Sequence, residues 1–264
     1  MATKLQLSIY DIYIKTCRLY REKKNRLLGF KRSSSLISDR YLENAPQPAC
    51  AILHGQGIPT RVWGGDAHRH LGAPFFPPEP GDLLFLLVPA TEPAGQVLLR
   101  AGYTKAEVPW NLQAIREFHN VFDPPQDGRR GRRQIILLDA DRFHQQLPQH
   151  PPFNEQDVMY PTCTQFLISL LETYLDLRGE EEMRLRMELA VEIGYIYRYQ
   201  AEAKTPEFET QLPQRLRRLH RDLVTNKSHM GDLGSWRCQR RYLQEGEGAN
   251  ATESVVEAGP SLES

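Results

Sequence analysis

The feature that most constrains the fold is a pair of glycines between a strand-like segment and a helix-like segment. Residues 59–63 end in Val-Trp, Gly64 and Gly65 follow, and residues 66–71 lack any strong helix breaker. Glycine takes the backbone geometry of a tight turn more readily than any other residue. The pattern therefore predicts a strand over 59–63 that passes through Gly64-Gly65 into a short helix over 66–71.

Two apolar segments further along the chain predict the centre of a sheet. Residues 83–88 read Leu-Leu-Phe-Leu-Leu-Val without interruption, and residues 134–138 read Gln-Ile-Ile-Leu-Leu before Asp139. Continuous apolar runs of this length, bounded by turn-forming residues, are typical of buried strands. Helices are predicted between and beside them, over 48–55, 92–101 and 112–119. This alternation predicts an α/β domain.

The second half of the chain has a different pattern. Apolar residues recur at helical spacing in three segments, and no strand pattern occurs between 153 and 243. The end of the chain, from Gly246, is polar and rich in Gly and Glu. We therefore predict four parts: an N-terminal extension over 1–45, an α/β domain over 46–150, a small helical domain over 153–243, and a disordered tail over 244–264.

Composition narrows the possible functions. The 264 residues are 40% hydrophobic and 25% charged, and 33 basic residues balance 33 acidic ones. A net charge of zero argues against a surface built for nucleic acid. No apolar run approaches the roughly 20 residues that a membrane helix needs, so no membrane interaction is expected. The four cysteines include no Cys-x-x-Cys pair, which disfavours a zinc site and fits a reducing, cytoplasmic location.

The order of these segments resembles the nucleotidyltransferases. Residues 63–67, Trp-Gly-Gly-Asp-Ala, and residues 86–88, Leu-Leu-Val, are similar to the pattern of the toxin-type and antibiotic-modifying members. Over residues 45–243 the chain also resembles a family of uncharacterised fungal proteins described as nucleotidyltransferase-like, with further similarity at 190–197 and 217–220. The resemblance implies a nucleotidyltransferase-like mixed sheet with flanking helices, followed by a small helical domain.

The resemblance also implies a site, and the sequence departs from it. Gly64, Gly65 and Asp66 are the expected phosphate or nucleotide-binding residues. The next strand of the family carries two magnesium-binding acids, and alignment on residues 86–88 places these at Leu83 and Phe85. Neither side chain can bind magnesium, which takes oxygen ligands.

Three other acids are candidate metal ligands. Asp82 directly precedes the strand, but strand side chains alternate, so it points away from the face of Leu83 unless a bulge redirects it. Asp139 and Asp141 follow the last predicted strand and match a later acid of the family. They are also typical turn residues at a strand end. Magnesium is the expected cofactor only if the protein is active.

Three functional hypotheses follow. The first is a degenerate, non-catalytic nucleotidyltransferase-fold protein that binds a nucleotide or a partner at Gly64-Gly65. The second is an active metal-dependent nucleotidyltransferase that uses Asp82 and Asp139. The third is a partner-binding protein that acts through the helical domain. Two basic segments, residues 129–133 and the arginines of 215–221, could bind phosphate but are more typical of solvated surface. His68 and His70 are two apart on a helix and are not expected to share a metal.

Overall fold

The computed structural model describes residues 48–73, 83–109, 112–125, 133–147, 159–179, 182–225 and 242. These residues pack as two compact units. The first unit contains the described residues of 48–70, 83–141 and 146–161, and the second contains 71–73, 142–145 and those from 162 onward. The predicted N-terminal extension over 1–45, the predicted tail over 244–264 and Asp82 lie outside the described residues.

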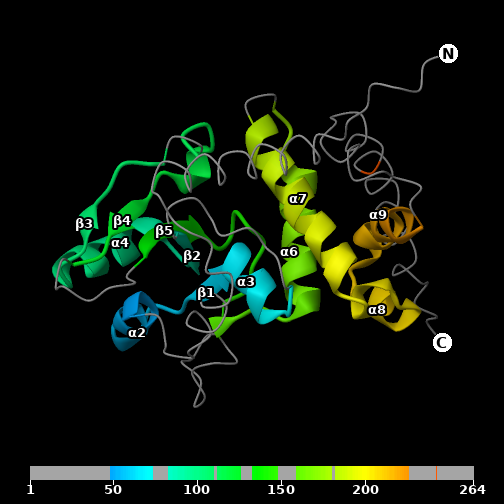
Figure 1. The fold of residues 1–264 in the computed structure, drawn as a ribbon, viewed down its shortest axis with the longest axis horizontal. Helices are drawn as coiled ribbons and strands as arrows, with labels where there is room; N and C mark the ends of the chain where they lie inside the picture. The colour runs from blue at the N-terminus through cyan, green and yellow to red at the C-terminus, as the bar shows by residue number, and fades with distance from the viewer. Residues whose placement is uncertain are drawn as a thin grey trace, which may run out of the picture. The chain divides into compact units, whose positions relative to one another are not determined.

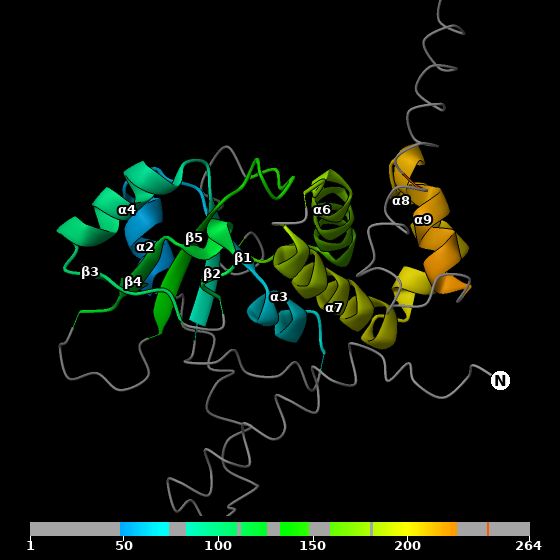
Figure 2. The same cartoon turned by 90° about the horizontal axis from the view of Figure 1, so that it is seen from above.

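The first unit is built on a mixed sheet (Figures 1 and 2). Its central strands, β2 and β5, are parallel, whereas β1 pairs antiparallel with β2, β4 with β5, and β3 with β4. This arrangement confirms the predicted α/β character with a mixed sheet. The described strands lie in the order β1 (Arg61–Trp63), β2 (Leu83–Val88), β5 (Gln134–Asp139), β4 (Val121–Asp123) and β3 (Thr104–Lys105).

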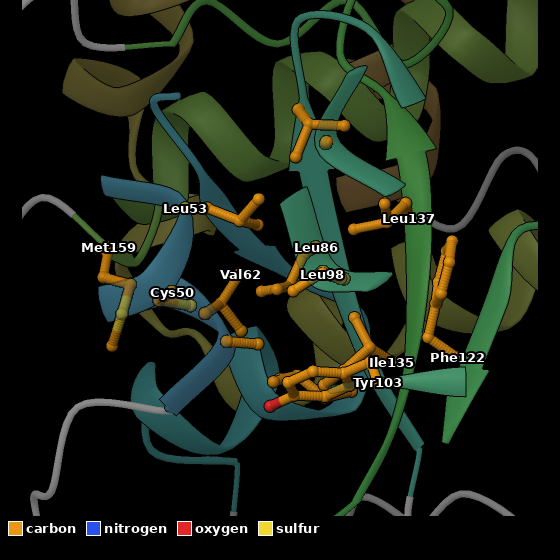
Figure 3. Close-up of a cluster of buried hydrophobic side chains, with 14 residues drawn as sticks. Cys50, Leu53, Val62, Leu86, Leu98, Tyr103, Phe122, Ile135, Leu137 and Met159 are labelled. Atoms are coloured by element: carbon orange, nitrogen blue, oxygen red, sulfur yellow. The ribbon is translucent and has the colours of Figure 1, made fainter. Parts of the chain in front are cut away.

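Strand β2 consists only of apolar residues because the side chains on both of its faces are buried. All six of its residues are buried. Leu84, Leu86 and Val88 share one face and pack against the helices α2 (Pro48–Gly55) and α4 (Thr91–Arg100). Figure 2 shows these two helices side by side, and Figure 3 shows their side chains meeting those of the sheet. Leu83, Phe85 and Leu87 form the other face and are also buried.

Three short elements differ from the sequence prediction. The predicted helix over 112–119 is reduced to a single 3₁₀ turn, η1 (Arg116–Phe118). Strands β3 and β4 have two and three residues and were not predicted, since segments of that length carry no readable period. Pairing with β5, rather than local sequence preference, places β4 in the sheet.

The second unit is helical in its described regular elements. Its helices are α6 (Cys163–Asp176), α7 (Met183–Tyr199), α8 (Pro206–Gln211) and α9 (Gln214–Val224), with a 3₁₀ turn, η2 (Glu202–Lys204). A reciprocal cap starts α6, because the Thr162 hydroxyl accepts from the Gln165 amide and the Gln165 side chain accepts from the Thr162 amide. Leucines at helical spacing form the buried stripe of α9. Within the described chain, every helix is too short or too polar to cross a membrane.

Candidate functional site

The Gly64-Gly65 junction has the predicted backbone arrangement. Strand β1 ends at Trp63, and the helix α3 (Gly65–His70) begins two residues later. The first helical hydrogen bond runs from the His68 amide to the Gly64 carbonyl at 3.1 Å. Gly64 has φ of +65°, a left-handed backbone conformation that residues with a Cβ adopt only at a cost in free energy. Both glycines are buried, so their amides are not the exposed anion-binding groups that the resemblance suggests.

Gly64→Ala is therefore expected to lower the free energy of unfolding by about 1–2 kcal/mol, the cost of a left-handed alanine. The matched control is Gly55→Ala at the end of α2, where φ is not positive and an added Cβ meets no atom within 4 Å. The control is expected to be neutral or slightly stabilising. Urea denaturation followed by circular dichroism measures both, and equal stabilities of the two variants would contradict the strained junction.

The strand beside this junction carries no acid at the two implied metal positions. Trp63 pairs with Phe85, so the end of β1 lies against the first half of β2. Leu83 is completely buried and Phe85 is 5% exposed, with its ring 5.0 Å from the ring of Phe118. Apolar side chains therefore fill the surface on which a metal site would need carboxylates.

The neighbouring strands do not supply the missing acids in this face. In β5, Gln134 pairs with Leu83 and Ile136 with Phe85, and paired residues of parallel strands share a face. The nearest carboxylate along this row is Asp123 of β4, which accepts a hydrogen bond from Gln134 Nε2 at 2.7 Å. That carboxylate is held by a neighbouring side chain of the sheet rather than directed at the Gly64-Gly65 junction.

The candidate ligands Asp139 and Asp141 lie at the opposite end of the sheet. Asp139 pairs with Val88, the last residue of β2, whereas the glycine junction lies near the first residues of that strand. Five residues of strand separate the two ends by roughly 16 Å, at about 3.3 Å per residue. Asp139 Oδ1 accepts from the Asp141 amide at 2.9 Å, which is the side-chain turn expected of a capping aspartate. Neither acid is brought to Gly64-Gly65.

Among the described residues, Asp66 is the acid that lies at the junction, and two arginines hold it. Arg69 Nη2 donates to Oδ1 of Asp66, and Arg133 Nη1 donates to Oδ2 at 2.5 Å. Arg133 Nη2 also donates to the backbone carbonyl of Leu83. The side chains of Asp66 and Arg133 are only 14% and 11% exposed. In the sequence, Arg133 is the last residue of a basic loop, and no local pattern marks its pairing with a residue 67 positions earlier.

Tyr160 and Cys50 lie close enough to this cluster to interact electrostatically with Asp66. The rings of His70 and Tyr160 stack at 4.1 Å and 8° between planes. Burial, the largest cause, raises the pKa of the Cys50 thiol to about 12, so it stays protonated and is a poor nucleophile. Burial lowers the pKa of His68 to about 3, and that ring stays neutral. His68 is buried and His70 exposed, so the two histidines face different surroundings.

The described residues at this site do not fit a magnesium ion. Mg²⁺ takes about six oxygen ligands in near-octahedral geometry. Both oxygens of Asp66 are engaged by guanidinium groups, and the two implied acid positions are apolar. Across the described residues, no three His, Cys, Asp or Glu side chains are grouped closely enough to hold a metal.

The arginines of α9, the other predicted phosphate-binding candidates, make contacts within their own unit. Arg215 pairs with Glu172 of α6 at 2.5 Å, and Arg221 pairs with Glu209 of α8 at 3.0 Å. Arg217 donates to the carbonyls of Leu212 and Thr210. These bonds join α9 to its neighbouring helices, which agrees with the interpretation of this face as ordinary polar helix surface.

Comparison with protein-family models, curated proteins and solved structures found no match to this chain. The relationship to nucleotidyltransferases is therefore a prediction that rests on the sequence motifs.

Proposed function

We propose that this chain is a non-catalytic relative of the nucleotidyltransferases that binds a nucleotide beside the Gly64-Gly65 junction. The observation that carries the proposal is the burial of Leu83 and Phe85 on the strand next to that junction. In-line nucleotidyl transfer depends on metal ions that neutralise charge on the attacking and leaving oxygens. Leucine and phenylalanine cannot hold such ions.

The side chains at the junction support a nucleotide as the ligand. Arg69 and Arg133 together carry two positive charges against the single negative charge of Asp66. The Arg69 side chain is 33% exposed, and the adjacent His70 is exposed and stacked on Tyr160. A nucleotide offers an anionic phosphate and a flat base, which suit a guanidinium and an aromatic pair.

The structure gives less support to the two alternatives. An active transferase that uses Asp82 and Asp139 needs both acids at one site, and Asp139 lies at the end of the sheet away from Gly64-Gly65. A partner-binding function through the helical unit would use its basic helix face, and the arginines of that face with described contacts are paired within the unit. Partner binding is therefore kept as an outcome of the test.

The test combines a transfer assay with a binding assay. Purified protein is incubated with α-labelled nucleoside triphosphates, magnesium or manganese, and RNA and protein acceptors. No label transfer and no pyrophosphate release are expected. Calorimetry with unlabelled nucleotides is expected to show binding that Arg69→Ala weakens by about tenfold, as for loss of one charge-assisted hydrogen bond. Arg100→Ala, an exposed arginine of α4 in the same unit, serves as the control and should bind normally.

Two results would overturn the proposal in different ways. Metal-dependent label transfer that Asp82→Ala abolishes would establish an active enzyme. Absence of both transfer and nucleotide binding would remove the nucleotide and leave the partner-binding hypothesis.

A further inference from the structure

A guanidinium group lies beside the position where the resemblance implies a metal ion. Arg133 precedes β5, and its Nη2 donates to the carbonyl of Leu83, one of the two implied acid positions. Its Nη1 donates to Asp66, which follows the glycine pair. The same cation thus joins the starts of three elements, α3, β2 and β5.

We propose that Arg133 is a built-in cation that takes the place of a divalent metal at this site, so that a nucleotide held there is bound without magnesium. The role of Arg133 as a cation at this site does not depend on a ligand, whereas binding without magnesium rests on the proposed nucleotide binding.

The chemistry of arginine suits this role. Its guanidinium stays charged at every physiological pH, and its planar fork directs two donors at two separate acceptors. Here one donor meets a carboxylate and the other meets a backbone carbonyl. Because the side chains of Arg133 and Asp66 are nearly buried, water screens their attraction less than at an open surface. The pair is therefore a fixed part of the unit rather than a surface ion pair.

The same contacts exclude a divalent ion. A metal at Asp66 would have to displace Arg133 from Oδ2 or Arg69 from Oδ1. Among the described residues it would then find only one carboxylate, since Leu83 and Phe85 are apolar and Asp123 is held by Gln134. One carboxylate leaves Mg²⁺ or Mn²⁺ short of protein ligands.

The first experiment uses Mn²⁺ alone with the full-length protein. The electron paramagnetic resonance signal of free Mn²⁺ is expected to be unchanged by wild-type protein. Binding of Mn²⁺ by the wild type that Asp66→Asn abolishes would overturn the proposal.

The second experiment measures the coupling between the two residues by melting temperature. Asp66→Asn and Arg133→Met are each expected to lower the melting temperature by about 5 °C, and the double variant by clearly less than the sum. Arg133→Lys, which keeps the charge but not the fork, should recover only part of the loss. Arg69→Met removes the more exposed partner of the same carboxylate and is the matched control, with a smaller effect. Additive effects of Asp66→Asn and Arg133→Met would overturn the proposal.

The third experiment compares nucleotide affinity in EDTA and in excess magnesium. Equal affinities within about twofold are expected, a free-energy difference of about 0.4 kcal/mol. Nucleotide binding that requires magnesium would overturn the proposal that the nucleotide is bound without this ion. If no nucleotide binds in either condition, the proposed function fails, while the Mn²⁺ and melting results still decide the role of Arg133.

Discussion

Phe85→Asp is expected to leave most of the protein molecules unfolded rather than to restore a metal site. Phe85 is 5% exposed and its ring packs against Phe118. Removal of a buried phenylalanine costs about 3–5 kcal/mol. The new carboxyl group adds a desolvation cost, because it is taken from water into an apolar surface. The sum exceeds about 5 kcal/mol, which is comparable to the whole stability of many domains.

Urea denaturation at pH 7, followed by circular dichroism, measures this loss. Phe85→Leu is the control, since it keeps an apolar side chain at the same position and is expected to cost no more than about 1.5 kcal/mol. A Phe85→Asp variant with the wild-type midpoint, or with newly gained Mn²⁺ binding, would show that this face of β2 can accept an acid. Either result would contradict the expectation that a carboxylate at position 85 unfolds the protein.

The parts of the fold that were predicted correctly are those with a strong local signal. The apolar runs at 83–88 and 134–138 correspond to β2 and β5, and the glycine pair marks the predicted junction between β1 and α3. These features can be predicted without distant residues, because the local sequence determines a long apolar strand and a left-handed glycine turn. Strands β3 and β4 depend on pairing with β5 and have no such signal.

The candidate site depended on strand direction, which the sequence did not reveal. Because β1 is antiparallel to β2, Gly64 lies near the start of β2. Because β5 is parallel to β2, Asp139 lies near the end of β2. The position of Asp139 after an apolar strand suggested a metal ligand. The pairing of β5 with β2 instead places Asp139 at the opposite end of the sheet from Gly64.

The Asp66–Arg133 pair shows a second limit of sequence reasoning. The two residues are 67 positions apart and meet only because β5 starts beside β2. A basic run such as residues 129–133 is usually solvated, and the sequence contained nothing to separate its last arginine from the others. Arg133 is nearly buried because the register of the sheet places the start of β5 beside the start of β2.

The contribution of Glu192 in α7 to the stability of the protein is expected to fall as pH rises from about 5 to about 9. The Glu192 residue is partly exposed, but its Oε2 atom has no access to solvent. This burial raises the pKa of the carboxyl group from 4.5 to about 8. The folded protein therefore holds a proton that the unfolded chain releases. The stabilisation from that proton is complete below pH 4.5 and is lost as pH rises through about 8.

Glu192→Gln is expected to remove this pH dependence, since glutamine stays neutral. At about 1.4 kcal/mol per pKa unit, the variant should gain on the order of 4 kcal/mol relative to wild type between pH 5 and pH 9. Burial lowers the pKa values of His68 and His220, which gives an opposite trend at acidic pH, but both histidines are present in both proteins and cancel in the difference. Glu188→Gln, on the same helix and paired with Arg184 at 3.1 Å, is the matched control and should follow the wild-type curve. Parallel curves for wild type and Glu192→Gln from pH 5 to pH 9 would show that the Glu192 carboxylate is solvated in the folded protein.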